Sequence, residues 1–324
     1  MKDLIDVLPG LELPVGEVNE RLDRMWETNT PSSEVASHAI QMNVVLHFGF
    51  AVTEEAAQER FNALLKFAQR YPSRVIVLCP SESIDDGSMQ AKLFSECYLD
   101  EGQGSKTCCE ALILSYRPDK CGYLANQVSV WLEPDLPVYH WLCGVRKERV
   151  KGYLDNLLSG VRRVIYDSSY EGKLLDALDW EDTVTIGDLA AARILPVRQS
   201  VGQFLSGFDP ATILKGLQTI EVGYNERLMG EGHRLLAWVH DCIGAASVNE
   251  TRIKSNLNRL SSGDAKDELT LKFAYGDGRH FEWRKNAKGM FGTIKTNLGG
   301  KEESFTTRVK TMSPQQAIAE ALFF

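Results

Sequence analysis

The chain has 324 residues, of which 44% are hydrophobic and 25% are charged. These are the values of an ordinary globular protein, and the length suggests about two domains. Asp and Glu number 44 against 36 Lys and Arg, which gives a formal net charge of −8. This balance argues against a nucleic-acid-binding protein, because such a protein needs basic residues to displace the counterions of phosphates.

The first ten residues, MKDLIDVLPG, contain Asp3 and Asp6 within their apolar stretch. A secretory signal needs an uninterrupted apolar core, so we expect none here. The longest apolar run, 44–52, is too short to cross a bilayer. The seven cysteines follow no paired framework, which is typical of a reducing compartment. We therefore expect a cytoplasmic protein without a membrane segment.

The first half of the chain alternates strands and helices. Thr53 is a good N-cap, and apolar residues behind it repeat at helical spacing. The stretch Arg74–Cys79 is almost entirely apolar, as in strands buried on both faces of a sheet. We expect helices at 54–70, 118–132 and 147–158, and strands at 36–50, 74–79, 91–100, 106–117, 137–143 and 163–167.

The pattern changes after Ser168. Residues 171–206 have helical character that Pro196 must interrupt, and a second helix is expected at 226–243. Apolar and polar residues then alternate in strands near 269–275, 281–283, 290–296 and 303–309, and a capped helix follows Ser313. We predict an α/β N-terminal domain, 1–170, with a mixed sheet covered by helices. An α+β C-terminal domain, 171–324, follows, with an antiparallel meander and a terminal helix.

The stretch EPDLPVYHWLCG, 133–144, places several chemically versatile residues on one strand. His140 and Cys143 are three positions apart, so their side chains point to opposite faces of the strand. They cannot share a metal ion or act as a nucleophile and its base. Pro134 and Pro137 stiffen the preceding loop, which is where an α/β protein commonly presents a binding surface.

Cys97 and Cys108 lie on the two strands of the expected hairpin. If the turn is centred near Gly102-Gln103, the two cysteines face each other directly and can form a redox-active pair. A register shifted by two residues makes them diagonal neighbours and forbids the bond. The alternative is that both are reduced and act as small hydrophobic side chains.

Signatures of catalysis and of cofactor binding are missing from the sequence. It contains no GxGxxG, HExxH, GxSxG or CxxC. The Gly-rich stretch 102–107 lacks the full phosphate-loop spacing and leads into a strand rather than a helix. We therefore predict no catalytic residues, no metal and no cofactor.

Several segments, taken in order, resemble the OpcA family, the glucose-6-phosphate dehydrogenase assembly proteins of the oxidative pentose phosphate cycle. They run through the first expected domain into the start of the second. The matching segments are Ser32-Ser33, Asn43–Val45, Tyr71–Val77, Pro134–Val138 with Trp141, Val164–Asp167, Asp188-Leu189 and Arg193–Pro196.

The resemblance implies a non-enzymatic protein that binds glucose-6-phosphate dehydrogenase, promotes its active oligomer and raises its apparent substrate affinity. Such an activator needs a surface patch rather than reactive groups. We expect the patch at the loop that contains Pro134, Asp135 and Pro137, supported by Trp141 behind it.

Two other functions remain open from the sequence. The first is an enzyme with its cleft between the domains, with Cys143, His47 or His233 as reactive groups. The second is a regulator that binds a sugar phosphate. Its candidate anion ligands are Arg162, Arg163 and Arg198.

Overall fold

The structure is a computed structural model of the 324-residue chain. It describes residues 3–28, 40–84, 88–99, 106–118, 121–171, 178–182, 184–246, 253–260, 268–286, 290–310 and 312–324.

The contacts divide the chain into two compact units, and neither is one continuous stretch. The first unit comprises Met1–Tyr166, Lys173–Gly187 and Pro314–Phe324, and the second comprises Asp167–Gly172 and Asp188–Ser313. The last helix of the chain therefore packs with the first unit. The expected division into 1–170 and 171–324 stays a prediction about domains.

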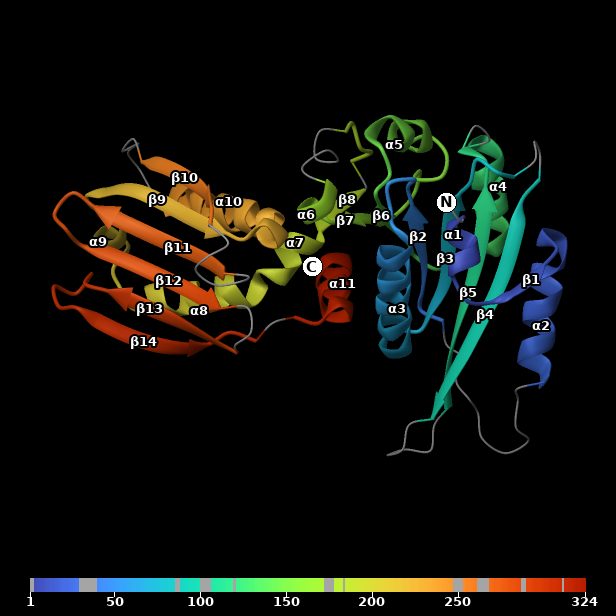
Figure 1. The fold of residues 1–324 in the computed structure, drawn as a ribbon, viewed down its shortest axis with the longest axis horizontal. Coiled ribbons are helices and arrows are strands. Elements are labelled where there is room, and N and C mark those ends of the chain that lie inside the picture. Colours follow the sequence, from blue (N-terminus) through green and yellow to red (C-terminus); the bar gives the residue numbers. More distant parts are fainter. Residues whose placement is uncertain are drawn as a thin grey trace. The chain divides into compact units, whose positions relative to one another are not determined.

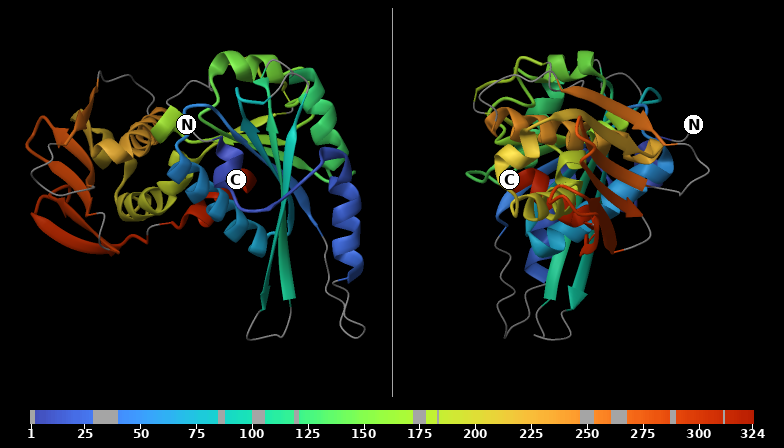
Figure 2. Two further views of the ribbon diagram at one scale, coloured as in Figure 1. Left: turned by 45° about the vertical axis from the view of Figure 1, so that its right-hand side comes forward. Right: turned by 90° about the vertical axis from the view of Figure 1, so that its left-hand side faces the viewer.

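The first unit is built on an eight-stranded sheet with the order β1-β4-β5-β3-β2-β6-β7-β8 (Figure 1). Strands β5, β3, β2, β6 and β7 run parallel. At one edge β4 pairs antiparallel with β5, and β1 pairs antiparallel with β4. Figure 2 shows β4 and β5 as two long strands side by side that extend past the other strands. The strands are β1 (Leu11–Leu13), β2 (Met42–Phe48), β3 (Ser73–Pro80), β4 (Gln90–Leu99), β5 (Lys106–Tyr116), β6 (Val138–Cys143), β7 (Arg163–Tyr166) and β8 (Thr185–Asp188).

Helices cover both faces of this sheet, so its central strands are apolar on both sides. Helices α3 and α11 pack against each other on one face (Figure 1). On the other face Val128 and Val150 join the core that contains Val45 and Leu142. The helices are α1 (Leu4–Val7), α2 (Val18–Thr28), α3 (Glu54–Arg70), α4 (Cys121–Trp131), α5 (Lys147–Tyr153) and α11 (Pro314–Phe323), with a 3₁₀ turn, η1, at Val15–Glu17.

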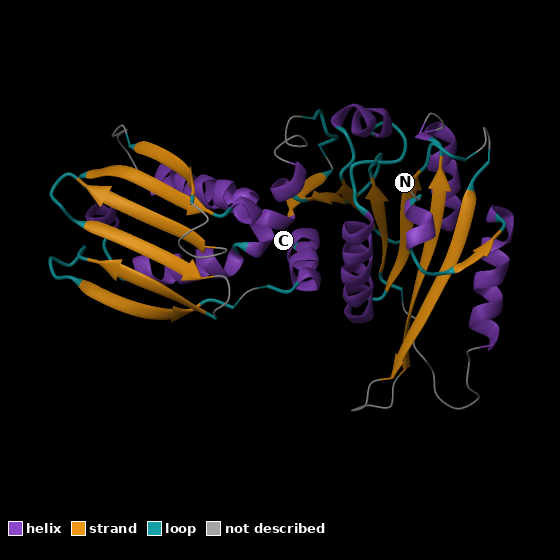
Figure 3. Ribbon diagram, viewed as in Figure 1, coloured by secondary structure: helices purple, strands orange, loops and turns teal. Residues whose placement is uncertain are grey.

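The second unit is a six-stranded sheet with helices on one face (Figure 3). Its strand order is β10-β9-β11-β12-β13-β14, antiparallel except for the β10–β9 pair. Glu282 pairs with Lys272 and Arg284, as expected of a solvated sheet face. The elements are α6 (Ser168–Glu171), α7 (Leu189–Arg193), α8 (Leu195–Leu205), α9 (Pro210–Leu214), β9 (Leu217–Tyr224), η3 (Glu226–Leu228), α10 (Met229–Ala246), β10 (Lys254–Arg259), β11 (Glu268–Tyr275), β12 (His280–Asn286), β13 (Phe291–Thr296) and β14 (Glu303–Arg308).

The predicted fold class is confirmed. The chain has an α/β part with a mixed sheet covered by helices, an α+β part with an antiparallel meander, and a C-terminal helix. The helix over 54–70 is confirmed as α3, and the Thr53 hydroxyl accepts the Ala56 N–H at 3.3 Å. The prediction of helical character over 171–206, interrupted at Pro196, is wrong at residues 185–188, which form β8. Val184, Thr185 and Ile186 are β-branched and favour an extended backbone.

Candidate functional site

The loop between α4 and β6 is held in place by a buried asparagine. Asn43 lies near the start of β2 and is fully buried. Its side-chain nitrogen donates to the carbonyls of Glu133 (3.0 Å) and Leu136 (3.4 Å), and its side-chain oxygen accepts the Glu133 N–H at 2.8 Å. Its backbone N–H donates to the Pro137 carbonyl at 2.9 Å. One residue therefore fixes both ends of the loop 133–137.

An ion pair and an unusual backbone angle complete the geometry of this loop. The Arg74 guanidinium pairs with the Glu133 carboxylate and donates to the Trp131 carbonyl at 3.4 Å. Asp135 has φ of +64°, which makes it the one non-glycine residue with positive φ in the part of the chain that the structure describes. Aspartate tolerates this conformation better than most residues. Pro134 and Asp135 are exposed, as is Pro137.

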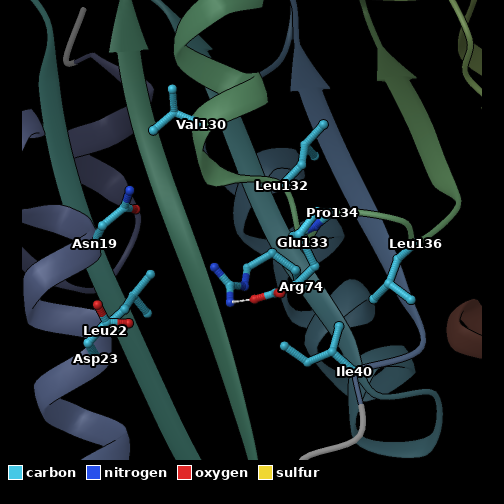
Figure 4. A pocket seen from close by; sticks show the side chains of 10 residues that line it. All are labelled: Asn19, Leu22, Asp23, Ile40, Arg74, Val130, Leu132, Glu133, Pro134 and Leu136. Carbon is cyan, nitrogen blue, oxygen red and sulfur yellow. Dashed lines mark hydrogen bonds and ion pairs between the residues drawn. The ribbon is translucent and has the colours of Figure 1, made fainter.

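A hollow of about 670 Å³ opens beside the loop (Figure 4). Its walls come from α2, the end of α4 and the loop itself, and the Arg74–Glu133 pair lies between them. The lining residues are Asn19, Leu22, Asp23, Ile40, Arg74, Val130, Leu132, Glu133, Pro134 and Leu136.

The hollow has the character of a docking surface. Six of its ten lining residues are leucine, isoleucine, valine or proline, while polar atoms make up the larger share of the lining surface. The hollow can therefore accept an apolar anchor from another protein together with polar contacts. Arg74 and Glu133 neutralise each other, which leaves the exposed Asp23 carboxylate as a rim acceptor for a basic group. Nothing in this set forms a nucleophile–base pair.

Trp141 lies behind the loop in the core rather than at its surface. It is 4% exposed and follows Tyr139 on the same face of β6, where the Tyr139 ring contacts Phe323 of α11. A contribution of Trp141 to the loop would therefore act through packing. The assignment of Pro134, Asp135, Pro137 and Trp141 to a partner site stays a prediction.

The register of the β4–β5 hairpin places Cys97 opposite Cys108. This is the unshifted register that a bond between them requires. Cys97 is disulfide-bonded in the structure. The side chain of Cys108 lies outside those that the structure describes, so the pairing and its redox activity stay predictions.

The residues considered for an enzyme do not come together. Cys143 pairs in register with Phe48, and His47 pairs with Leu142, so the thiol and the imidazole point to opposite faces of the sheet. His233 is exposed on α10 in the second unit. Burial lowers the pKa of His47 to about 3, and burial together with the charge of His47 does the same for His140. Both imidazoles therefore stay neutral near pH 7.

The arginines considered for a sugar phosphate are also separate. Arg163 donates to the Ala321 carbonyl at 3.1 Å, near the end of α11, and Arg162 is exposed beside it. Arg198 lies on α8 of the second unit, and its Nε has no hydrogen-bond partner among the described residues. No group of three His, Cys, Asp or Glu side chains suited to a metal ion occurs within the described ranges. Among the helices described, none is both long and apolar enough for a bilayer crossing.

Asp167, Asp188 and Arg193, from segments that carry the family resemblance, all lie in the second unit. Arg193 binds both carboxylate oxygens of Asp167, at 2.7 and 2.8 Å, and its Nε donates to Glu231 at 2.5 Å. Asp188 accepts the Ala190 N–H at 2.9 Å and the Ser168 hydroxyl at 2.7 Å. These carboxylates are already satisfied by protein donors, which indicates a structural role.

Sequence reasoning located the loop but missed the residues that fix it. Asn43, Arg74 and Glu133 decide the conformation, although each lies within or next to a segment singled out for its family resemblance. A signal was present, because Asn43 is a polar residue at the start of a strand that is otherwise apolar apart from His47. A buried amide there must find partners, and a neighbouring loop backbone is the usual source.

Comparison with known families identifies the region that contains this loop. Residues 65–179 match the family model described as the glucose-6-phosphate dehydrogenase subunit N-terminal domain, OpcA_G6PD_assem. The resemblance seen in the sequence is thereby confirmed. No curated protein matches the chain in sequence.

Proposed function

Since residues 65–179 of this chain match the N-terminal domain model of the OpcA glucose-6-phosphate dehydrogenase assembly family, we propose that the protein is an assembly factor for that dehydrogenase. In this proposal the protein binds the dehydrogenase, favours its active oligomer and raises its apparent affinity for substrate. The family match is the observation that carries the proposal. The name of the family describes assembly rather than catalysis.

The physical requirement on such a factor is preferential binding. It must bind the competent state of the dehydrogenase more tightly than the incompetent state, because a ligand with equal affinity for both shifts nothing. A differential of about 2 kcal/mol shifts the equilibrium roughly thirtyfold. A rigid surface serves this purpose better than a mobile one, since less entropy is lost on binding.

The loop 133–137 and the hollow beside it support the proposal as a docking surface. Asn43 and Arg74 fix the loop from neighbouring strands, so its shape exists before a partner binds. The hollow offers apolar side chains among polar ones, with an exposed carboxylate at Asp23. We infer that it receives an apolar side chain of the dehydrogenase, with a basic group nearby.

The test uses the purified protein and the dehydrogenase of the same organism. Val130 lines the hollow and is 61% exposed on α4, so Val130→Glu places a charge there at little cost to folding. We expect the wild type to co-elute with the dehydrogenase and to lower the substrate concentration needed for half-maximal NADPH formation. The variant should weaken both effects at least tenfold, because a buried unpaired charge is costly.

Tyr123→Glu is the matched control. Tyr123 is on the same helix, is 60% exposed and is not among the residues of the hollow. The Tyr123→Glu variant should bind and activate the dehydrogenase as the wild type does. Wild-type protein that neither co-elutes nor changes the kinetics would overturn the proposed function. Equal losses for the two variants would overturn the assignment of the hollow alone.

A further inference from the structure

A second, smaller crevice lies in the first unit at the carboxyl ends of the parallel strands. The hollow described above lies near the other ends of these strands. From β2 the chain passes to β3 on one side, and later returns to β6 on the other side of β2. The ends of β2 and β6 are thus a topological switch point, where open α/β sheets commonly bind ligands. A crevice of about 180 Å³ is found there, lined by residues that follow both strands.

The backbone segments that flank this crevice are packed closely together. The Gly49 N–H donates to the Cys143 carbonyl at 2.7 Å. A Cβ on Gly49 would lie 1.8 Å from the carbonyl oxygen of Gly144, and Gly144 itself has φ of +65°. Only glycine suits such positions. The two turns therefore hold each other in place, and the crevice is formed without a ligand.

The charged side chains that line the crevice are predominantly basic. Arg146 is exposed and forms no ion pair with any residue that the structure describes. Arg149 donates one N–H to the Pro118 carbonyl at 2.8 Å, which leaves its other donors for a ligand. Glu82 is exposed and supplies one negative charge against these two positive charges. Guanidinium groups bind phosphate oxygens through paired hydrogen bonds.

A buried imidazole lies in the wall of the crevice. His47 is 1% exposed, and its Nε2 is 2.5 Å from the Tyr116 hydroxyl, which in turn is 3.2 Å from the Tyr153 hydroxyl. The Nδ1 of His47 has no hydrogen-bond partner among the described residues. When Tyr116 donates to Nε2, the neutral ring carries its proton on Nδ1. This nitrogen has no exposed surface in the crevice, so the donors available to a ligand there are those of Arg146 and Arg149.

We propose that this crevice binds a phosphate group, with Arg146 and Arg149 as its cationic contacts. The group belongs either to inorganic phosphate or to a phosphorylated metabolite. The volume of about 180 Å³ is below that of pockets for drug-sized molecules, so the crevice encloses the phosphate rather than a whole large carrier. The site is distinct from the hollow at the loop 133–137 and does not depend on the dehydrogenase.

The test is calorimetric titration of the full-length protein alone, with sodium phosphate and with glucose 6-phosphate, at constant ionic strength. We expect saturable binding of both probes and none of glucose. Arg146→Gln should weaken binding by at least about tenfold, because a charge-assisted hydrogen bond is lost. Tighter binding of glucose 6-phosphate would identify a phosphorylated metabolite as the ligand, and equal affinities would identify phosphate itself.

Arg24→Gln is the control for general charge effects. Arg24 is an exposed arginine of α2 that pairs with Glu20 and is not among the crevice residues. The affinity of the Arg24→Gln variant for the probes should stay within about twofold of wild type, since an exposed ion pair contributes little. The absence of saturable phosphate binding would overturn the proposal, as would equal losses in the two variants. Circular dichroism of both variants confirms that each is folded.

Discussion

At the scale of single residues, the sheet of the first unit contains buried polar groups that meet very different surroundings. Asn43 has all its side-chain hydrogen-bonding atoms engaged by the loop 133–137. Glu110 on β5 is 7% exposed, and burial raises the pKa of its carboxyl to about 7, although the charge of Arg74 acts in the opposite direction. Asn43 therefore stabilises the fold at any pH, whereas the contribution of Glu110 depends on pH.

Glu110→Gln should make the protein less sensitive to pH. Because the folded-state pKa of Glu110 lies above the unfolded value, the native state holds a proton that the unfolded chain releases between about pH 4.5 and 7. The free energy of unfolding of the wild type should thus fall as pH rises through this window. The glutamine variant lacks this term, so its stability relative to wild type should increase by roughly 1–3 kcal/mol from pH 5 to pH 7.5. Urea unfolding at each pH measures the difference.

The difference in unfolding free energy between wild type and Glu110→Gln cancels the contributions of the other titrating groups. His47 and His140 have lowered pKa values, so their neutral forms stabilise the fold above about pH 6.5 and this contribution is lost as pH falls. That trend opposes the one from Glu110 but is common to both proteins. A stability difference that stays constant between pH 5 and pH 7.5 would show that Glu110 ionises normally in the fold.

At the scale of secondary-structure elements, α11 is expected to stabilise the first unit. Leu322 is 2% exposed, whereas Phe324 just after the helix is 88% exposed. Leu322→Ala should lower the free energy of unfolding by about 2–4 kcal/mol through lost burial and a cavity. Phe324→Ala should change it by less than about 0.5 kcal/mol. Denaturant unfolding of both variants distinguishes them, and similar small values would mean that α11 contributes little.

The sequence predicted elements well where one periodicity dominated. The apolar strand β3 and the amphipathic helix α3 were expected with nearly the observed bounds. Strands β8, β9 and β10 were not expected, because their residues are only partly apolar and β10 is mostly exposed. Such strands are stabilised by pairing with neighbours distant in sequence, and local patterns do not record this.

The candidate sites show the same contrast between local sequence patterns and contacts between residues distant in sequence. Pro134 and Pro137 marked the loop 133–137, since the backbone preferences of proline are local. The contacts of Asn43 with that loop join residues 90 or more positions apart, so no local pattern contains them. The crevice depends on strand order, which places Gly49 against Gly144. Adjacency of this kind becomes visible only once the sheet is assembled.

At the scale of the whole molecule, α11 follows the second unit in chain order but belongs to the first unit by its contacts. The sequence suggested that the terminal helix completes a domain 171–324, whereas its contacts place Pro314–Phe324 with the first unit. The rings of Phe323, Phe67, Tyr71 and Tyr139 form an aromatic cluster that joins α11 to α3 and β6. The family-matched region 65–179 therefore packs against a segment far outside itself.

Removal of residues 314–324 tests which unit depends on the helix. We expect hydrogen exchange in the truncated protein to accelerate in α3 and β7, which contact α11, because their apolar surface becomes accessible to water. Exchange in β11 and β12 should stay as in wild type. Mass spectrometry of peptides from the two units reads both regions in one experiment. Faster exchange in β11 and β12 with no change in α3 would instead favour an independent domain at 171–324. The expected result would mean that the family-matched region needs the end of the chain for its stability.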